Sequence, residues 1–268
     1  MDQARRHAYL RAMGIVPWVP RGMELEPIAP ALAPVPESEP ESEPEPRTDP
    51  GPQALPARPG SPLVDSPPLR AAAAFEQAMG GDVASLDWDA LGAAVADCRA
   101  CGLCETRTQT VFGVGDRRAS LLVIGEAPGA DEDREGEPFV GRAGQLLNRM
   151  LAAIGLQRQQ VYIANILKCR PPGNRDPRPE EVLRCQPYLM RQIALIGPRI
   201  ILAVGRISAQ TLLGTDAPLG RLRGRWLELG PDAIPLRVTY HPAYLLRSPD
   251  QKAKAWEDLT AVAQRLEA

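Results

Sequence analysis

The sequence predicts an α/β fold of three layers (α/β/α) with a central four-stranded parallel sheet, preceded by a disordered N-terminal arm. Two observations lead to this prediction. From residue 119 onward, four short apolar runs typical of buried strands alternate with segments of helical periodicity. Such alternation predicts parallel strands whose crossover helices cover both faces of the sheet. The first part of the chain differs, because 14 of the 29 prolines fall between Pro27 and Pro68.

Charge divides the chain in the same way. The whole chain has 31 basic and 33 acidic side chains, of which residues 1–85 carry 7 and 12, so the remainder is slightly basic. No apolar run approaches the roughly 18–20 residues that a membrane-spanning helix needs. The composition therefore excludes a membrane protein, a collagen, a coiled coil and a single compact domain over the whole chain.

The N-terminal residues 1–22 are interpreted as a short docking peptide. Apolar side chains alternate there with arginines, and Trp18 lies between Val16 and Pro20. A tryptophan in an otherwise polar arm is a typical anchor of a protein interface. The alternative is a frayed terminus. If the segment docks, we expect its partner to be a replication protein.

Residues 23–85 are predicted to be a Pro/Glu-rich disordered linker. Glu37–Pro46, with the sequence ESEPESEPEP, combines like charges with missing backbone donors, so it should stay extended. The linker has room for a short helix around Leu69–Met79. The folded domain is then expected to occupy residues 86–268.

The elements of this domain are predicted in order. A first helix over Leu86–Val95 could be capped by Ser85. Four strands are expected at Ala119–Glu126, Val161–Leu167, Arg199–Gly205 and Leu236–His241. Further helices are expected at Leu146–Ile154, Glu180–Ile196, Ser208–Leu213 and Lys252–Leu266. Parallel sheets bind ligands at the carboxyl ends of their strands, which here carry Gly125–Gly129, Asn165, Gly205 and His241–Arg247.

All five cysteines fall in one part of this domain, at Cys98, Cys101, Cys104, Cys169 and Cys185. An odd number with two C-x-x-C spacings suits metal ligation better than a disulfide framework. Tetrahedral zinc and an iron–sulfur cluster both accept four thiolates. The spacing alone neither chooses between them nor decides which four bind. The N-terminus also lacks the apolar core of a secretory signal, so we expect a cytoplasmic protein.

Three motifs carry a close resemblance to a known family. GEAPGADEDREGEPFVGRAGQLLNRML (Gly125–Leu151), ANILKCRPPGNRDP (Ala164–Pro177) and HPAYLLR (His241–Arg247) resemble the family-four uracil-DNA glycosylases, the iron–sulfur members of their superfamily. The resemblance covers about Leu91 to Leu266. It implies a monomeric enzyme that hydrolyses the N-glycosidic bond of deoxyuridine in DNA and leaves an abasic site for base-excision repair. It also implies a 4Fe–4S cluster, with a free Cys104 and with ligands at Cys98, Cys101, Cys169 and Cys185.

Several residues then become candidates for binding uracil. The amide of Asn165 can accept from uracil N3–H and donate to O4, although a capped strand end would be the favoured explanation without the resemblance. The resemblance implies that Phe139 stacks on the base. The ordinary explanation for such a phenylalanine is packing in the core. Backbone amides of the turn could face uracil O2, and this turn is formed by Gly125, Glu126, Ala127 and Pro128.

The catalytic candidates are His241 and Glu132. As a donor to uracil O2, His241 would stabilise the departing anion, whereas a lone histidine is more often a packing residue. In the best-known branch of the superfamily, an aspartate that orients the attacking water stands at the position of Ala127. The family-four pattern lacks this aspartate too, so Ala127 marks the branch. The resemblance therefore favours Glu132 as the residue that assists the water or the sugar cation.

DNA contacts are expected from local basic patches. One patch is the loop between the cluster cysteines, with Lys168, Arg170, Arg175 and Arg178, and the second is Arg221–Trp226. Leu245 and Leu246 are expected on an exposed loop, where they suit a wedge that fills the gap left by a flipped base; burial against the closing helix is the alternative. Arg247 would then hold a phosphate.

Two other functions compete with the glycosylase. A non-catalytic iron–sulfur DNA-binding or polymerase-associated module is favoured by Ala127 and by the N-terminal peptide. An electron-transfer protein fits the cysteines but leaves Asn165, Phe139 and His241 unexplained.

Overall fold

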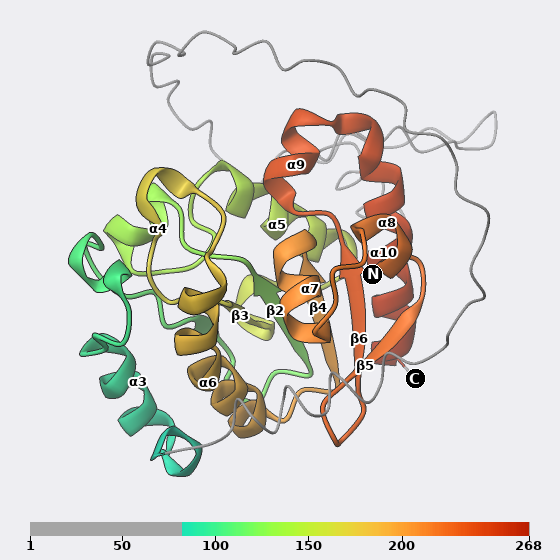
Figure 1. Cartoon of the computed structure of the whole chain (residues 1–268). Coiled ribbons are helices and arrows are strands. Elements are labelled where there is room, and N and C mark those ends of the chain that lie inside the picture. Colours follow the sequence, from blue (N-terminus) through green and yellow to red (C-terminus); the bar gives the residue numbers. More distant parts are fainter. Residues whose placement is uncertain (1–81, 268) are drawn as a thin grey trace, which may run out of the picture.

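The computed structural model describes residues 82–267. The predicted docking peptide, the helix around Leu69–Met79 and most of the linker lie outside the described residues. Within residues 82–267, no helix is long and apolar enough to cross a membrane. The described part is a three-layer α/β/α fold (Figure 1).

The sheet has six strands in the order β1-β3-β2-β4-β6-β5. Their bounds are β1 Val114–Gly115, β2 Leu121–Gly125, β3 Tyr162–Asn165, β4 Ile200–Val204, β5 Trp226–Leu229 and β6 Ile234–Thr239. The four predicted strands are confirmed as the central parallel set β3-β2-β4-β6. The prediction of four strands in total is wrong, because short antiparallel strands β1 and β5 pair with the two outer members.

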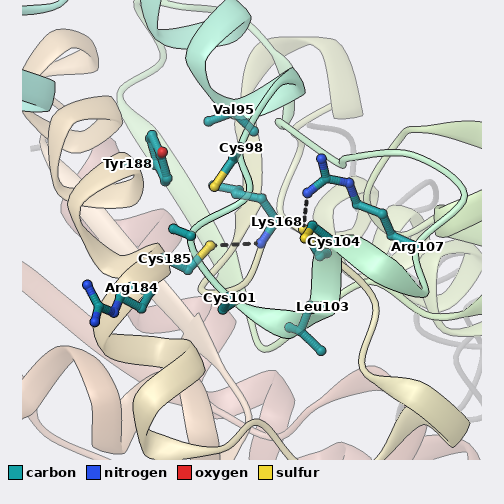
Figure 2. Close-up of a pocket in the computed structure, with 12 residues that line it drawn as sticks. Val95, Cys98, Cys101, Leu103, Cys104, Arg107, Lys168, Arg184, Cys185 and Tyr188 are labelled. Atoms are coloured by element: carbon teal, nitrogen blue, oxygen red, sulfur yellow. Dashed lines mark hydrogen bonds between the residues drawn. The ribbon is translucent and has the colours of Figure 1, made fainter.

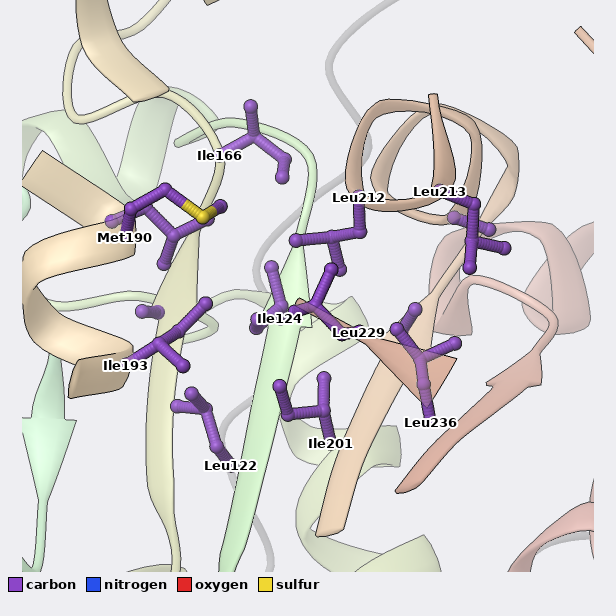
Figure 3. Close-up of a cluster of buried hydrophobic side chains, with 14 of the residues drawn as sticks. Leu122, Ile124, Ile166, Met190, Ile193, Ile201, Leu212, Leu213, Leu229 and Leu236 are labelled. Carbon is purple, nitrogen blue, oxygen red and sulfur yellow. The ribbon is translucent and has the colours of Figure 1, made fainter. Parts of the chain in front are cut away.

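Helices cover both faces of this sheet. Their bounds are α3 Trp88–Ala96, α4 Ala130–Glu135, α5 Arg142–Ala153, α6 Pro179–Ile196, α7 Arg206–Leu213, α8 Leu219–Leu222, α9 Pro242–Arg247 and α10 Lys252–Glu267. One apolar cluster joins α6 and α7 to the sheet face that carries Leu122 and Ile124 (Figure 3). A second cluster packs α5, α9 and α10 against the other face, which carries Leu121 and Val123. Successive residues of β2 thus point to opposite layers, as a strand requires.

The first helix starts later than predicted. Helix α3 begins at Trp88, and the carboxylate of Asp87 accepts a hydrogen bond from the Ala90 amide at 2.9 Å. Ser85 instead ends a 3-10 turn at Asp82–Ser85. Asp87 is thus the cap that the prediction assigned to Ser85.

Candidate active site

The carboxyl ends of the parallel strands border a pocket of about 400 Å³. Its polar side chains are those of Glu126, Glu132, Asn165, Asn174, Arg175, His241 and Arg247. They belong to the three sequence motifs, which the fold brings together because β2 and β3 are parallel neighbours and α9 follows β6. In the register of this pair, Gly125 lies opposite Asn165. The structure therefore assembles the predicted base-binding residues at the predicted edge of the sheet.

Asn165 and Phe139 line the pocket, and Gly125 packs closely against both of them. Asn165 is 1% exposed, and its Oδ1 has no hydrogen-bond partner among the described residues. A Cβ atom at Gly125 would lie 2.3 Å from Asn165 Oδ1 and 2.6 Å from the Phe139 ring. Only glycine fits there. A buried carbonyl oxygen without a partner costs free energy, so the amide is free to accept from a donor that residues 82–267 do not supply.

Phe139 is held in a strained backbone conformation. Its φ of 55° is unusual for any residue other than glycine. The Arg158 guanidinium donates to the carbonyl oxygens of Pro138 and Phe139, the latter at 3.2 Å. A Cβ atom at Gly144 would lie 1.8 Å from the Phe139 oxygen, so helix α5 can approach this loop closely only with glycine there. These contacts fix the phenyl ring in the pocket wall.

Glu132 ties the two sides of the first motif together. Its Oε1 accepts from the amides of Val140 and Gly141, at 3.0 and 3.2 Å, and its Oε2 accepts from the Gly129 amide at 3.0 Å. Three backbone donors thus hold the carboxylate while one edge of it lines the pocket. Sequence reasoning did not foresee this structural contribution.

The other acidic residues of this motif differ in position. Asp133 is buried, and both of its oxygens accept from the Thr108 amide. Asp131 forms an ion pair with Arg134 at 2.9 Å. Glu126 lines the pocket, where burial, together with the charge of Asp176, raises its pKa to about 7. Glu126 and Glu132 are therefore the two motif acids that line the pocket.

His241 precedes α9 and is set up as a neutral donor. Its Nδ1 accepts from the Ala243 amide at 3.2 Å, so the proton of a neutral ring is on Nε2. Burial, with the nearby positive charge of Arg247, lowers the pKa of His241 to about 4. Its ring lies 5.6 Å from the Phe139 ring, centroid to centroid. The side chain is therefore uncharged near neutral pH and faces the pocket.

The loop in the second half of the second motif contributes more to the pocket than expected. Asn174 and Arg175 both line it. Arg175 is already bound by the largely buried carboxylate of Glu181, at 2.9 Å from Nη1, and also donates to the Asp176 carbonyl. Asn174 was not predicted, although a polar residue in a glycine turn of the motif was a signal. Its Oδ1 accepts from Arg170 Nε at 2.8 Å.

Two expectations about surface residues need correction. Lys168 is 1% exposed, so this lysine is not part of a basic surface patch. Leu245 and Leu246 lie on helix α9 rather than on a loop. Leu245 is buried against the α5 layer because it continues the apolar face of α9, whereas Leu246 is 37% exposed. Tyr244 is exposed to the same extent.

The second predicted basic patch is only partly free. Arg223 forms a hydrogen bond to the buried carboxylate of Asp258 at 2.7 Å, and its guanidinium lies over the Tyr240 ring. Arg237, from β6, shares the same carboxylate at 3.2 Å. The charge of Arg223 is thus used inside the fold, while Arg221 and Arg225 remain exposed.

The five cysteines line a second pocket, between α3, the 3-10 turn at Gly102–Glu105 and α6 (Figure 2). None is in a disulfide. Cys169 and Cys185 are buried, and Cys98, Cys101 and Cys104 are partly exposed. Among the described residues, no group of three His, Cys, Asp or Glu side chains is arranged to hold a single metal ion.

The donor set of this pocket suits a group larger than one ion. A four-iron cluster takes one thiolate on each iron, so its ligands are spread around it. Arg107 donates to Cys169 Sγ at 3.0 Å, and the main-chain amide of Lys168 donates to Cys185 Sγ at 3.2 Å. Such donors stabilise thiolate ligands. The residues present therefore fit an iron–sulfur cluster.

Comparisons with known proteins agree with this geometry. The model of the uracil DNA glycosylase superfamily matches residues 112–260. A type-4 uracil-DNA glycosylase of Archaeoglobus fulgidus is 44% identical over 176 residues, which are 63% of this chain and 88% of that protein. One of Thermotoga maritima is 43% identical over 158 residues, or 58% of this chain and 80% of that protein.

A more distant relative belongs to another branch. A type-5 uracil-DNA glycosylase of Thermus thermophilus is 35% identical over 118 residues, 38% of this chain and 53% of that protein. The type-4 proteins have the higher identity and the wider coverage. This confirms the resemblance that the three sequence motifs indicated. The chain belongs to the uracil-DNA glycosylase superfamily, and within it to the type-4 family.

Proposed function

We propose that the protein hydrolyses the N-glycosidic bond of deoxyuridine in DNA, releasing uracil and leaving an abasic site. As a member of its family it is a DNA glycosylase, a hydrolase. The observation that carries uracil as the substrate is the buried Asn165 Oδ1, which has no partner among the described residues and borders the pocket.

Uracil recognition follows from the hydrogen-bonding pattern of this amide. With the base flipped out of the duplex, Asn165 Oδ1 accepts from N3–H and Nδ2 donates to O4. Cytosine has no proton on N3 and carries an amino donor at position 4, so both contacts would fail. The Phe139 ring supplies an apolar surface for stacking. Substrate choice thus rests on a rigid amide beside a rigid ring.

His241 assists the departure of the base. Bond cleavage leaves negative charge on uracil. A neutral imidazole with its proton on Nε2 can donate a hydrogen bond from that nitrogen to O2. Fixed donors aimed at developing charge are a large source of catalysis. Backbone amides of the turn from Gly125 to Pro128 add to the same stabilisation.

Glu132 assists the attacking water or the sugar cation. Its Oε1 already accepts two hydrogen bonds, but Oε2 accepts one, from Gly129, and retains a free lone pair. That lone pair can receive a water proton or face a cationic sugar. Ala127, which also lines the pocket, has no group that could do this.

DNA is held by exposed groups near the pocket. Leu246 and Tyr244, both exposed on α9, are suited to fill the gap in the base stack, with the buried Leu245 supporting the helix beneath them. Arg247 and Arg170 contact phosphates, and Arg175 shapes the loop through Glu181. Phosphate contacts of this kind make binding salt-dependent.

The cysteine pocket holds a 4Fe–4S cluster through Cys98, Cys101, Cys169 and Cys185. Cys101 is preferred over Cys104 because the resemblance to family four implies ligands at these four positions and leaves Cys104 free. When bound, the cluster would cross-link the segment at residues 98–101 to both ends of residues 169–185, which form a loop and the first turns of α6. That loop carries Asn174 and Arg175 into the base pocket.

The activity test uses a uracil-containing oligonucleotide, followed by alkali to cleave abasic sites. Wild-type protein should produce uracil-dependent cleavage, and an otherwise identical cytosine oligonucleotide should stay intact. Asn165→Ala should abolish most of the cleavage. Asn148→Ala, an exposed asparagine on α5, is the matched control and should behave as wild type. Tight DNA binding without cleavage by the wild-type protein would refute the proposal.

We further propose a cytoplasmic monomer that serves base-excision repair, with the arm at residues 1–22 binding a replication protein. Reduced cysteines at metal-ligand spacing support the compartment. A pull-down from cell extract with intact protein and with Trp18→Ala tests the arm. Equal recovery of replication proteins by both would contradict the docking role, and gel filtration of the pure protein checks the monomer.

A further inference from the structure

Lys168 is a buried cation that lies between the two pockets. Its Nζ donates to the carbonyl oxygen of Asn165 at 3.0 Å, to that of Phe112 at 3.3 Å and to Gln192 Oε1 at 2.6 Å. An ammonium group has three protons, and all three are used. Its main-chain amide meanwhile donates to Cys185 Sγ. One residue therefore touches both the base-recognition residue and the cysteine pocket.

These contacts do not balance the charge of Lys168. All three acceptors of its ammonium group are neutral oxygens. A buried charge without an opposite charge is expensive. Lys168 lines the cysteine pocket together with Cys169 and Cys185, whose thiolates can supply the opposite charge.

Arg107 is a second cation at the same pocket (Figure 2). Its Nη1 donates to Cys169 Sγ at 3.0 Å, and its Nη2 donates to the Ala96 carbonyl at 3.2 Å. A 4Fe–4S cluster in its common oxidised form, with four thiolates, is a dianion. Arg107 and Lys168 together match that charge. Of the two, only Lys168 also contacts Asn165.

We propose that Lys168 is a positioning residue that couples the cluster to uracil recognition, an inference that rests on the proposed function. The cluster's negative charge keeps the ammonium group buried, and the ammonium group holds the carbonyl of Asn165. The Asn165 side chain has little room to move beside Gly125, where even a Cβ atom would lie 2.3 Å from its Oδ1. Removing the positive charge should therefore weaken both cluster retention and uracil binding.

The test uses the full-length protein carrying Lys168→Met, which keeps much of the side-chain volume and removes the charge. Iron per chain is measured before and after exposure to a chelator, and inhibition by free uracil measures the base pocket directly. We expect faster iron loss and a roughly tenfold weaker inhibition, the scale of a lost hydrogen bond from a charged group. Lys254→Met, at an exposed lysine on α10, is the matched control and should change neither.

Arg107→Met separates positioning from simple loss of the cluster. It removes the other cation, so it should also speed iron loss. Compared at equal iron content, it should weaken uracil inhibition much less than Lys168→Met does. Equal weakening of uracil inhibition by the two variants would overturn the proposal. It would show that any change of charge at the cysteine pocket weakens uracil binding, whether or not the residue contacts Asn165.

A second variant tests the proposal if the first one does not fold. If Lys168→Met does not fold, Gln192→Leu removes one acceptor of the same ammonium group and should weaken uracil inhibition while iron content stays at the wild-type level. Unchanged inhibition in either variant overturns the inference and leaves the proposed function intact. A wild-type protein without iron or without excision overturns both.

Discussion

The rings of Phe139 and His241 are in direct contact across the base pocket, with centroids 5.6 Å apart and planes tilted by 33°. A base sandwiched between two rings needs about 7 Å, twice a normal stacking distance of roughly 3.5 Å. Uracil therefore cannot lie between them. In the proposed stacking on Phe139, the base would instead present an edge to His241, an orientation that would let Nε2–H donate to a carbonyl oxygen of the base.

His241→Ala should lower the single-turnover excision rate by about 10²–10³, because it removes one fixed donor to the leaving group. Affinity for undamaged DNA should stay nearly constant, since the imidazole faces the base pocket rather than the backbone. Filter binding and quenched-flow excision assays measure the two quantities. An equal loss in both would make His241 a structural residue.

The same histidine should remain neutral throughout the physiological range. Its pKa of about 4 lies below the ordinary value of 6.5, so the excision rate should show no step from imidazole titration between pH 5 and 8. The chain has two histidines, and His7→Asn leaves a single imidazole for NMR titration. A midpoint near 6.5 for the remaining signal would contradict the neutral-donor mechanism.

Asn165→Asp should weaken uracil excision and admit cytosine only weakly. An ionised carboxylate accepts but does not donate, so the contact to uracil O4 is lost, whereas a protonated one offers a different pattern to the base edge. Parallel assays on uracil, cytosine and thymine oligonucleotides give the ratio of rates. Wild-type uracil excision by this variant would exclude Asn165 from recognition.

Serine substitutions should distinguish the cysteines that bind the cluster from the free thiol. Cys169→Ser and Cys185→Ser should yield colourless, poorly folded protein, because both thiols are buried in the cysteine pocket. Cys104→Ser should retain the brown colour and about four irons per chain. Iron analysis and visible absorption decide the outcome. Loss of iron in Cys104→Ser with retention in Cys101→Ser would reverse the choice between them.

The sequence predicts the residues of the base pocket well because strand ends converge in a parallel sheet. Asn165 and His241 each stand at a predicted strand end, whereas Phe139, in the loop between α4 and α5, was named from the family resemblance. The structure places all three side chains at one pocket. The central strands were found for a related reason: buried strands are continuously apolar. The edge strands β1 and β5 lack that signal, since most of their residues are partly exposed.

Other features depend on packing that no local pattern reveals. Lys168 belongs to a run of charged loop residues, but the fold closes over it and supplies three acceptors. Leu245 and Leu246 are identical in type, and the short helix α9 alone decides that one is buried and the other exposed. Glu132 similarly acquires its three backbone donors from a loop that folds back on the first motif.

Glu126→Gln should stabilise the protein, and the gain should grow with pH. Burial, with the charge of Asp176, raises the pKa of Glu126 from 4.5 to about 7, so between these values the folded state holds a proton that the unfolded state releases. The wild-type protein therefore loses stability relative to the variant as pH rises from 4.5 to 7. Above pH 7 the difference should level off at about 3 kcal/mol, or roughly 6–12 °C in Tm.

Thermal melts of both proteins at pH 5 and pH 8 measure this difference. Glu228→Gln, at an exposed position on β5, is the matched control, and its Tm difference from wild type should not change with pH. Arg206, which bonds Asp176 at 2.7 Å, limits the effect because its positive charge lowers the Glu126 pKa. In an Arg206→Gln background, the Tm gain from Glu126→Gln at pH 8 should therefore be larger. A gain that is the same at both pH values would show that Glu126 is ionised in the folded state across this range.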